Sequence, residues 1–482
     1  MNNNEKIEVL KFYDFNDKNK IDNNNNNEDN KNSKIDNNNN NNEDNKNSKI
    51  DNNNNNEDNK NSKIKIWLRT IPLIMIPILF LLTVISLHTK RLVKVPFNYI
   101  SCVLLSIFIY LFIIGLFKIK KSKKNTTKKK KVFKVIKNII LTIYILGCFG
   151  FTFLLYGPYD NFRTWLISTA MSTMNHQYLC KWFYNDDEIL KVIKGNYILE
   201  VNEETNTDLI DMEEEITYDN EYEEQILKHD KNAKYKIIEL EVNGQKGYLA
   251  AIYDPSMVKV SVAKSLGVKG QLVTKMAEDN KAMLAVNGGG FYDPGNNSTG
   301  GMPTGITISN GKVITDNNYS SYTQSGGIIG ITNDNKLVLI KGATAQKALN
   351  MNVRDGVSWG PFLIVNGKKS FIKGNGGWGY AARTAIGQRS DGIILLLVIN
   401  SNSSRTKGAD MVNLTDIMDK YGAINAANLD GGTSTVMVLP QKEALKYKDT
   451  CTSTYCYIND PVDGALRHRT RAIATSIIVT DK

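Results

Sequence analysis

The chain contains few of the side chains that usually build metal or thiol sites. Among its 482 residues there are four histidines and five cysteines, and no Cys/His spacing fits a zinc site. The glycine run Gly288–Gly290 lacks the lysine and the spacing of a nucleotide-binding loop, and there is no Gly-x-Ser-x-Gly elbow. We therefore predict no cofactor, although these patterns leave a divalent cation open.

The first 62 residues have few apolar side chains and consist mostly of Asn, Asp, Glu and Lys. A repeat starts at Lys20 and recurs from Lys34 and from Lys49, with one apolar residue in each unit. A segment that cannot bury apolar surface cannot offset the conformational entropy lost on folding. We therefore predict a disordered tail over residues 1–66.

Three long apolar segments follow the tail, at Ile71–Leu87, Pro96–Phe117 and Ile139–Tyr156. None of them shows an amphipathic face, which argues against helices of a soluble core, and each approaches the roughly 20 residues that a membrane span needs. The first apolar run begins too late in the chain to be a secretory signal peptide. We predict three transmembrane helices in a membrane domain over residues 67–157.

Positive charge is concentrated between the second and third apolar segments. The net charge of the chain is +11, and residues 118–137 hold eleven lysines and no acidic residue. Because positively charged loops stay on the cytoplasmic side, we predict a multi-pass protein of the cell membrane, with a cytoplasmic tail and an extracytoplasmic segment after Tyr156. The lipid bilayer is then a partner. Topology and anionic lipid headgroups account for the lysines, so we expect no nucleic acid partner.

The chain changes character twice beyond the apolar segments. Residues 158–195 mix aromatic and polar side chains, which predicts amphipathic helices lying against the membrane or against the next domain. Residues 196–234 are rich in acidic side chains and are expected to form a solvated linker. Cys451 and Cys456 lie further along, on the outer side, where a disulfide and two free thiols are equally compatible with the sequence.

From residue 235 to the end, short β-type runs alternate with hairpin turns. Asn-Gly or Asp-Gly pairs that begin at Asn243, Asn310, Asn366 and Asp391 separate apolar segments, and such pairs are the strongest local signal for a hairpin. Residues 270–280 and 414–421 have a helical pattern. Together these patterns predict an α+β domain in which helices cover mixed β-sheets.

Two apolar runs about 140 residues apart end in an amide followed by glycines, at Asn287-Gly288-Gly289 and at Asn428-Leu429-Asp430-Gly431-Gly432. Glycine lets a ligand come close to the backbone, so we expect the two ends to form one composite site. Asp430 suits a general acid/base or a nucleophile, and the two asparagines suit orientation of hydroxyls or stabilisation of an anion. The alternative for Asp430 is a turn former, which is the commoner role of such a residue.

Other candidate residues also follow glycines or lie at strand ends, namely Thr304, Gly360, Arg383 with Thr384, and Arg471. A guanidinium group is a planar fork that binds two phosphate oxygens at once. The arginines therefore suit a phosphate ligand, although a lone arginine at a strand edge is more often an ion-pair partner.

Seven short motifs occur in a consistent order and spacing, namely Val286–Phe291, Pro303-Thr304-Gly305, Gly360-Pro361, Ala382–Gly387, Lys407-Gly408-Ala409, Asn425–Gly432 and Arg471–Ala474. Through these motifs the C-terminal half of the chain resembles the phosphodiester glycosidase family. Residues 156–176 resemble the juxtamembrane part of bacterial membrane-anchored members, many of which are named exopolysaccharide biosynthesis proteins.

The resemblance implies hydrolysis of a sugar-1-phosphodiester at the anomeric carbon, with a sugar phosphodiester or an envelope polysaccharide as substrate. It implies that Asp430 and Asn428 flank the anomeric centre and that Asn287 shapes the sugar pocket. The substrate-binding residues that it implies are Gly288, Gly289, Thr304, Gly360, Arg383, Thr384, Arg405, Gly431, Gly432, Ser434 and Arg471. Of these, the arginines at 383 and 471 would hold the phosphate, and Thr304 and Ser434 would bond sugar hydroxyls.

Most glycosidases use two carboxylates, and the sequence identifies one. A phosphate leaving group needs little protonation, which would remove the need for a second. Two other functions stay open from the sequence. One is a non-catalytic module that binds envelope glycans and assists polymer assembly, and the other is a membrane-tethered adaptor whose tail recruits a cytoplasmic partner.

Overall fold

The computed structural model describes residues 64, 66–89, 97–118, 128–171, 177–213, 220–293, 298–317, 326–342, 344–402, 408–461 and 470–481. The predicted disordered tail lies outside these residues except for positions 64 and 66, and Arg405 lies outside them as well.

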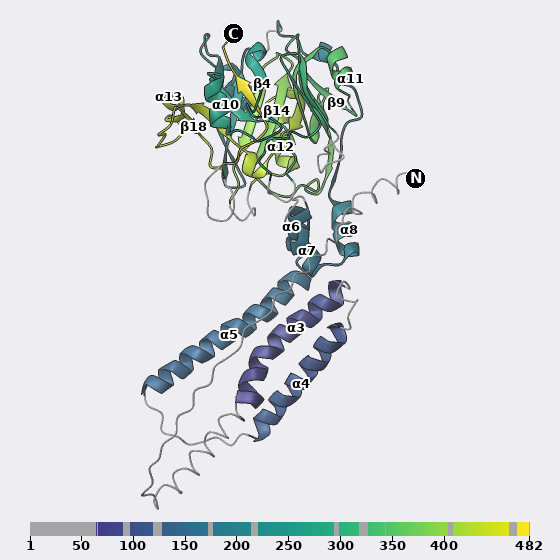
Figure 1. Cartoon of the computed structure of the whole chain (residues 1–482), viewed down its shortest axis with the longest axis vertical. Helices are drawn as coiled ribbons and strands as arrows, with labels where there is room; N and C mark the ends of the chain where they lie inside the picture. The colour runs from purple at the N-terminus through teal and green to yellow at the C-terminus, as the bar shows by residue number, and fades with distance from the viewer. Residues whose placement is uncertain are drawn as a thin grey trace, which may run out of the picture. The chain divides into compact units, whose positions relative to one another are not determined.

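Three apolar helices pack together in the N-terminal part of the described chain (Figure 1). The π-helix η2 (Ile66–Thr70) continues into α3 (Ile71–Thr89), and α4 (Phe97–Lys118) and α5 (Lys128–Tyr156) follow. The Tyr144 hydroxyl of α5 donates to the Ile74 carbonyl of α3 at 2.7 Å. Many apolar side chains of α4 and α5 are exposed, and fewer of those of α3 are.

The prediction of three membrane spans is corrected by these helices. In the described residues, two segments are long and apolar enough to cross a membrane, Trp67–Thr89 and Val135–Tyr156, and the apolar part of α4 is shorter, at Ile100–Leu116. At 1.5 Å per residue, that part of α4 extends about 26 Å, whereas a bilayer core is about 30 Å thick. The structure therefore has two candidate spans and a third, shorter apolar helix.

Three short helices follow α5 and pack on one another around a small apolar cluster. They are α6 (Asp160–Met171), α7 (Gln177–Phe183) and α8 (Asp186–Gly195). Tyr184 and Ile167 are fully buried in this cluster, and the Tyr184 hydroxyl donates to the Leu155 carbonyl at 3.2 Å. The Asn185 side chain caps α8 by accepting from the Glu188 amide. Packing against protein thus explains the aromatic side chains of this segment that are buried.

The acidic segment after α8 is held against the C-terminal domain over its first part. Strand β1 (Tyr197–Leu199) pairs with β13 (Phe371–Lys373). A carboxylate oxygen of Glu200 then accepts from the Phe362 amide at 2.7 Å, and Thr205 bonds both backbone groups of Leu339. The 3-10 helix η4 (Thr207–Leu209) and helix α9 (Glu221–Leu227) come next. We call residues 197–211 the strap.

The C-terminal domain contains three larger β-sheets, and every strand pair in its described residues is antiparallel. The seven-stranded sheet has the order β12 (Lys368–Lys369), β11 (Phe362–Val365), β16 (Ala423–Asn428), β14 (Arg383–Arg389), β15 (Ile394–Ile399), β3 (Gln245–Ile252) and β2 (Tyr235–Val242). The first five-stranded sheet has the order β18 (Tyr455–Tyr457), β17 (Met437–Pro440), β5 (Leu284–Asn287), β19 (Thr475–Val479) and β4 (Val258–Val262). The second has the order β7 (Lys312–Asp316), β6 (Ile306–Ser309), β10 (Val353–Trp359), β8 (Gly327–Thr332) and β9 (Leu337–Lys341).

Short helices cover the sheets, so the predicted α+β class is confirmed while the sheets are antiparallel rather than mixed. Helix α12 (Met411–Lys420) packs on β16 and β11, α10 (Val273–Asp279) on β5 and β17, and α11 (Ala345–Asn350) on β10 (Figure 1). The remaining short elements are η5 (Pro255–Met257), η7 (Gly432–Ser434) and α13 (Gln441–Ala444). The hairpins expected from Asn-Gly pairs are present, and their asparagines have positive φ, as at Asn243, where φ is 52°.

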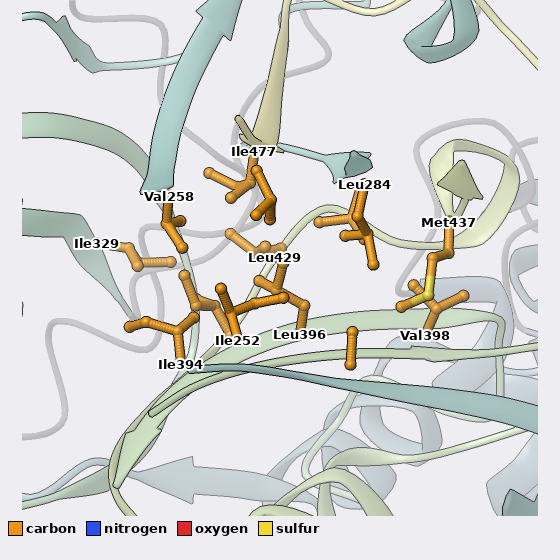
Figure 2. Packing of buried hydrophobic residues seen from close by; sticks show 14 of the residues in the cluster. Ile252, Val258, Leu284, Ile329, Ile394, Leu396, Val398, Leu429, Met437 and Ile477 are labelled. Carbon is orange, nitrogen blue, oxygen red and sulfur yellow. The ribbon is translucent and has the colours of Figure 1, made fainter. Parts of the chain in front are cut away.

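The main core lies between the seven-stranded sheet and the two smaller sheets. Figure 2 shows Leu396 of β15 and Ile252 of β3 near Leu429, Leu284 of β5 and Ile477 of β19. All of these side chains are buried, and each contributes about 1.5–3 kcal/mol when it is fully removed from water. This shared core fixes the ends of β5 and β16 relative to each other.

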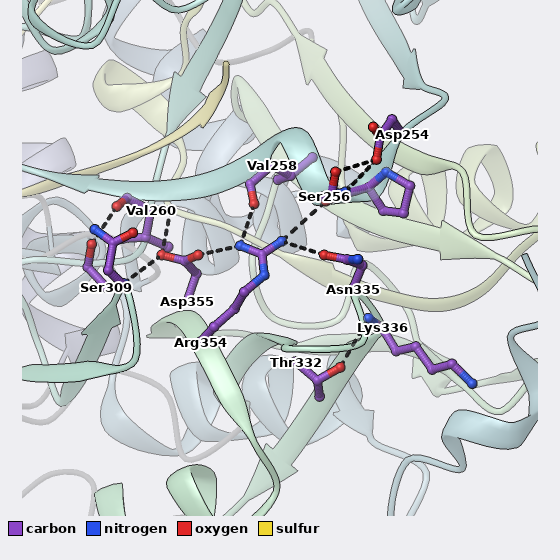
Figure 3. A network of polar contacts seen from close by, with 12 residues as sticks. Asp254, Ser256, Val258, Val260, Ser309, Thr332, Asn335, Lys336, Arg354 and Asp355 are labelled. Atoms are coloured by element: carbon purple, nitrogen blue, oxygen red, sulfur yellow. Dashed lines mark hydrogen bonds and ion pairs between the residues drawn. The ribbon is translucent and has the colours of Figure 1, made fainter. Parts of the chain in front are cut away.

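A buried polar network ties β4 to β10 (Figure 3). Asp355 accepts from the backbone amides of Val260 at 3.1 Å and Asn310 at 3.3 Å, and it pairs with Arg354. Arg354 also donates to the Val258 carbonyl at 2.9 Å. Burial raises the pKa of Asp355, because its hydrogen bonds and the neighbouring guanidinium offset only part of the desolvation.

The two cysteines that follow β17 form a disulfide. Cys451 and Cys456 are bonded, so the structure selects the first of the two alternatives that the sequence leaves open. The bond closes a short, largely exposed loop that leads into β18, the strand in which Cys456 lies.

Candidate active site

The two glycine-rich strand ends meet, and Asn287 is the residue that joins them. Its Nδ2 donates to the Asp430 carbonyl at 2.7 Å, and its Oδ1 accepts from the Thr384 hydroxyl at 2.7 Å and from the Val436 amide at 3.2 Å. Asn287 is fully buried. It therefore connects β5 to β14 and β16, which belong to another sheet, and all its bonds go to protein. The structure gives it a positioning contact rather than an open face toward a ligand.

The glycines after Asn287 allow other chain segments to pass very close. A Cβ on Gly288 would lie 2.5 Å from the Thr475 hydroxyl, and one on Gly289 would lie 2.7 Å from the Ser358 carbonyl. The Gly288 carbonyl also accepts from the Asp430 amide at 3.2 Å. Packing between β5, β10 and β19 thus accounts for these two glycines, which the resemblance assigns to a sugar pocket.

Asp430 follows β16 and keeps a partly exposed surface. Its Oδ1 accepts from the Gly431 amide at 2.9 Å. Burial raises the pKa of Asp430 to about 6, and hydrogen bonds from Ser434 and Gly431 together with the charges of Arg471 and Arg383 limit that rise. A carboxyl with this pKa exchanges a proton near neutral pH, which suits acid or base chemistry. The sharp turn is completed by Gly432, whose φ is 63°.

Arg383 is held rigidly beside this turn. It is 5% exposed, and its Nε donates to the Ala409 carbonyl at 3.2 Å. Its Nη2 donates to the carbonyls of Trp378 at 2.7 Å and Gly379 at 2.8 Å. A Cβ built on Gly431 would lie 3.6 Å from Arg383 Nη1, so the guanidinium is close to the Asp430 turn. Its charge is fixed there by backbone oxygens.

Arg471 lies in the segment before β19 and acts on the same carboxyl through its charge. It forms an ion pair with Asp293, and its guanidinium carbon lies 4.8 Å from the centre of the Phe291 ring. Its side chain is 27% exposed, against 5% for Asp293. Arg471 therefore combines a fixed position with a surface that solvent or a ligand can reach.

Buried polar atoms without a partner occur on the strands around the site. The Asn428 Nδ2 donates to the Gly360 carbonyl at 2.8 Å, but its Oδ1 has no hydrogen-bond partner. The hydroxyl of Thr304 is also buried and unpartnered. An unsatisfied buried polar group costs about 1–3 kcal/mol, which a bound hydroxyl can recover. Ser434 is buried and bonds to Asp430.

The structure adds residues that the sequence patterns do not identify. Asp293 is a buried carboxylate next to the predicted site, and Thr475 contributes the hydroxyl that accepts from the Gly289 amide at 3.2 Å. Trp378 stacks near Arg383 at 5.7 Å. Asp293 was within reach of sequence reasoning, because it directly follows the motif Gly290-Phe291-Tyr292. Among the described residues, no group of three or more His, Cys, Asp or Glu side chains is arranged to hold a metal ion.

Comparison with known proteins finds a match to a family model and matches to distant relatives. Residues 280–480 match the family model for phosphodiester glycosidase. The SPbeta prophage-derived uncharacterized protein YomE of Bacillus subtilis is 24% identical over 220 residues, which cover 43% of this chain and 33% of that protein. The matched region therefore spans a third of the length of that relative.

Among solved structures, the catalytic domain of zebrafish N-acetylglucosamine-1-phosphodiester alpha-N-acetylglucosaminidase, auto-inhibited by its pro-peptide, is 22% identical with a TM-score of 0.40. That match covers 54% of this chain and 87% of the zebrafish chain. A hypothetical protein from Synechocystis is 15% identical, covers 51% and 61% of the two chains, and has a TM-score of 0.31. By this match to the family model, residues 280–480 of the chain are similar to a phosphodiester glycosidase domain.

Proposed function

We propose that the C-terminal domain hydrolyses the bond between the anomeric carbon of a sugar and a phosphodiester. One observation carries the proposal. Asp430 is a partly exposed residue whose carboxyl has a pKa raised by burial to about 6, and the charges of Arg383 and Arg471 act on that carboxyl. A base flanked by two cations fits a reaction in which water attacks and a phosphate departs.

The proposed reaction uses few groups. Asp430 in its ionised form takes a proton from water, and the water oxygen forms the new bond to the anomeric carbon. The bond from that carbon to the bridging oxygen breaks, and the electron pair stays on the phosphate as a phosphomonoester. A phosphate with a second pKa near 6 is a good leaving group, so the reaction does not depend on a second carboxylic acid.

The neighbouring residues stabilise charge and hold the sugar in this proposal. Arg471, which is partly exposed, contacts the departing phosphate, while Arg383 supplies a fixed positive charge behind the Asp430 turn. The unpartnered oxygens of Asn428 and Thr304 bind sugar hydroxyls. Asn287 holds the strand ends in register through its three hydrogen bonds.

The proposal also locates the domain on the outer side of the cell membrane. The lysine-rich segment that starts at Lys118 directly precedes the candidate span Val135–Tyr156. Lysines favour the cytoplasmic side, so one crossing by this last span takes the domain outside, whichever way α4 lies. A disulfide at Cys451 and Cys456 agrees with an oxidising exterior. The substrate would then belong to envelope polysaccharide or glycan metabolism.

The test compares the full chain in detergent with two variants that carry matched changes. Asp430→Asn removes the proposed base, and Asp416→Asn makes the same change on the exposed face of α12. Release of free sugar from a panel of sugar-1-phosphodiesters is measured for each. We expect release by the wild type and by Asp416→Asn, and a loss of at least about 100-fold in Asp430→Asn. Binding of these compounds without any release would instead indicate a glycan-binding module.

A further inference from the structure

We infer that Asp293 is a positioning residue that directs the Arg471 guanidinium at the phosphate and so makes the site selective for a phosphate leaving group. This inference rests on the proposed function of the domain. It starts from a difference between the two arginines of the site.

The two guanidinium groups are held by different kinds of partner. Arg383 donates to three backbone carbonyls and is 5% exposed. Arg471 is held by one carboxylate and by the face of the Phe291 ring, and 27% of its side chain is exposed. Only a guanidinium that a ligand can reach forms direct bonds to phosphate oxygens. Arg471 is therefore the better candidate for contact with the phosphate.

Asp293 is built to hold another group rather than to react. It is 4% exposed, and its Oδ1 accepts from the Ser298 amide at 2.9 Å while its Oδ2 pairs with Arg471. Burial alone would raise the pKa of Asp293, but the Ser298 hydrogen bonds and the Arg471 charge outweigh it and hold that pKa below its ordinary value. Asp293 thus stays ionised at neutral pH, which excludes it as the general acid of the reaction.

Phe291 and Asp293 both constrain Arg471. The guanidinium carbon lies over the Phe291 ring, 4.8 Å from its centre, and Nη2 donates to Oδ2 of Asp293. A free arginine side chain loses rotamer entropy when it is fixed. Two partners that fix it before the ligand arrives reduce this cost of binding. Arg471 is then preorganised for two-oxygen contact with a phosphate.

The same contact links phosphate binding to the base. Arg471 lowers the pKa of Asp430 through its charge. A guanidinium that swings away would leave the Asp430 pKa higher, so the acid limb of the activity profile would move to higher pH. A loss of stability alone does not move that limb, and this difference separates a positioning role from a merely structural one.

The experiment uses the full chain in detergent and compares Asp293→Asn with Asp391→Asn. The control breaks another buried ion pair, Arg389 with Asp391. This pair lies at the end of β14 that is opposite to Arg383. KM and kcat are measured over pH for a sugar-1-phosphodiester and for an aryl glycoside of the same sugar. We expect Asp293→Asn to raise KM for the phosphodiester about tenfold, which is the value of one charge-assisted hydrogen bond, to leave KM for the aryl glycoside unchanged, and to move the acid limb to higher pH for both substrates.

Two further measurements complete the test. Arg471→Lys should reproduce the KM effect of Asp293→Asn, because it keeps the charge and loses the planar fork. Phosphorus NMR titration with inorganic phosphate reports binding without turnover, and Asp293→Asn should weaken that binding in the same proportion. Equal losses on both substrates, or unchanged phosphate binding, would overturn the inference. A wild-type chain that binds phosphate in an Asp293-dependent manner but releases no sugar would overturn the proposed hydrolysis alone.

Discussion

Asn287→Ala should lower the free energy of unfolding of the C-terminal domain by about 3–6 kcal/mol, because three buried groups lose their partner together. The amide side chain bonds the Asp430 carbonyl, the Thr384 hydroxyl and the Val436 amide. Each buried group left unsatisfied costs about 1–3 kcal/mol. Simple addition gives about 3–9 kcal/mol, and relaxation between neighbouring sites makes the upper part of that range unrealistic.

Urea unfolding of residues 196–482, followed by tryptophan fluorescence, measures this change. Thr384→Val is the matched control, because it removes one of the three bonds and keeps the shape of the side chain. We expect it to cost about 1–2 kcal/mol. Asn287→Asp should lie between the two, since it keeps an acceptor for Thr384 and turns the donor toward Asp430 into an acceptor. A cost below about 1 kcal/mol for Asn287→Ala would show that the strand ends are joined by packing and that the hydrogen bonds contribute little.

Three other predictions concern single residues. In a pH–rate profile, activity should fall about tenfold per pH unit below pH 6, the pKa region of Asp430. Folding raises that pKa, so the protonated carboxyl favours the folded state. Asp430→Asn should therefore be at least as stable as the wild type at pH 8. Asp355→Ala should cost about 3–5 kcal/mol because it leaves Arg354 partly buried without its partner, whereas Lys368→Ala, which breaks an exposed pair, should cost under about 0.5 kcal/mol in the same urea assay. The Cys451–Cys456 bond closes a six-residue loop. Its reduction opens this short loop and should lower the free energy of unfolding by at most about 2 kcal/mol, which unfolding with and without reductant measures.

Local sequence signals predict the strands and helices of this domain because the turn-forming residues between them are recognisable in the sequence. Asn-Gly pairs such as Asn310-Gly311 require positive φ, which both residues adopt, and they end and restart strands at the expected places. The meeting of the two strand ends could also be predicted, since Asn287 and Asp430 close buried runs of similar composition. The turns are short-range features that need no knowledge of three-dimensional partners, whereas the meeting of the strand ends follows from the similarity of the two runs.

The contacts that define the site depend on pairings that a single sequence does not reveal. Asn287 and Thr384 are bonded across two different sheets, and no local pattern specifies which sheets face each other. Asp293 is followed by Pro294 and reads as a turn residue, so its pairing with Arg471, 178 positions away, is visible only in the fold. The hydropathy pattern likewise overestimates the length of the apolar part of α4. A continuous apolar run in the sequence does not show where the apolar part of the helix ends.

The strap also protects an edge of the fold. In the described residues, strand β9 ends its sheet and pairs with β8 alone, and side chains bond its outer backbone groups: Gln388 accepts from the Leu337 amide at 2.5 Å and Asn425 donates to the Leu337 carbonyl at 3.4 Å. Thr205 accepts from the Leu339 amide at 2.9 Å and donates to the Leu339 carbonyl at 3.2 Å, which occupies the central pair of those groups. Exposed strand edges recruit strands from other molecules and lead to aggregation. A fragment cut at the apparent start of the domain, residue 235, would lose the two bonds that Thr205 makes to Leu339 and leave those backbone groups of the edge strand without their partner.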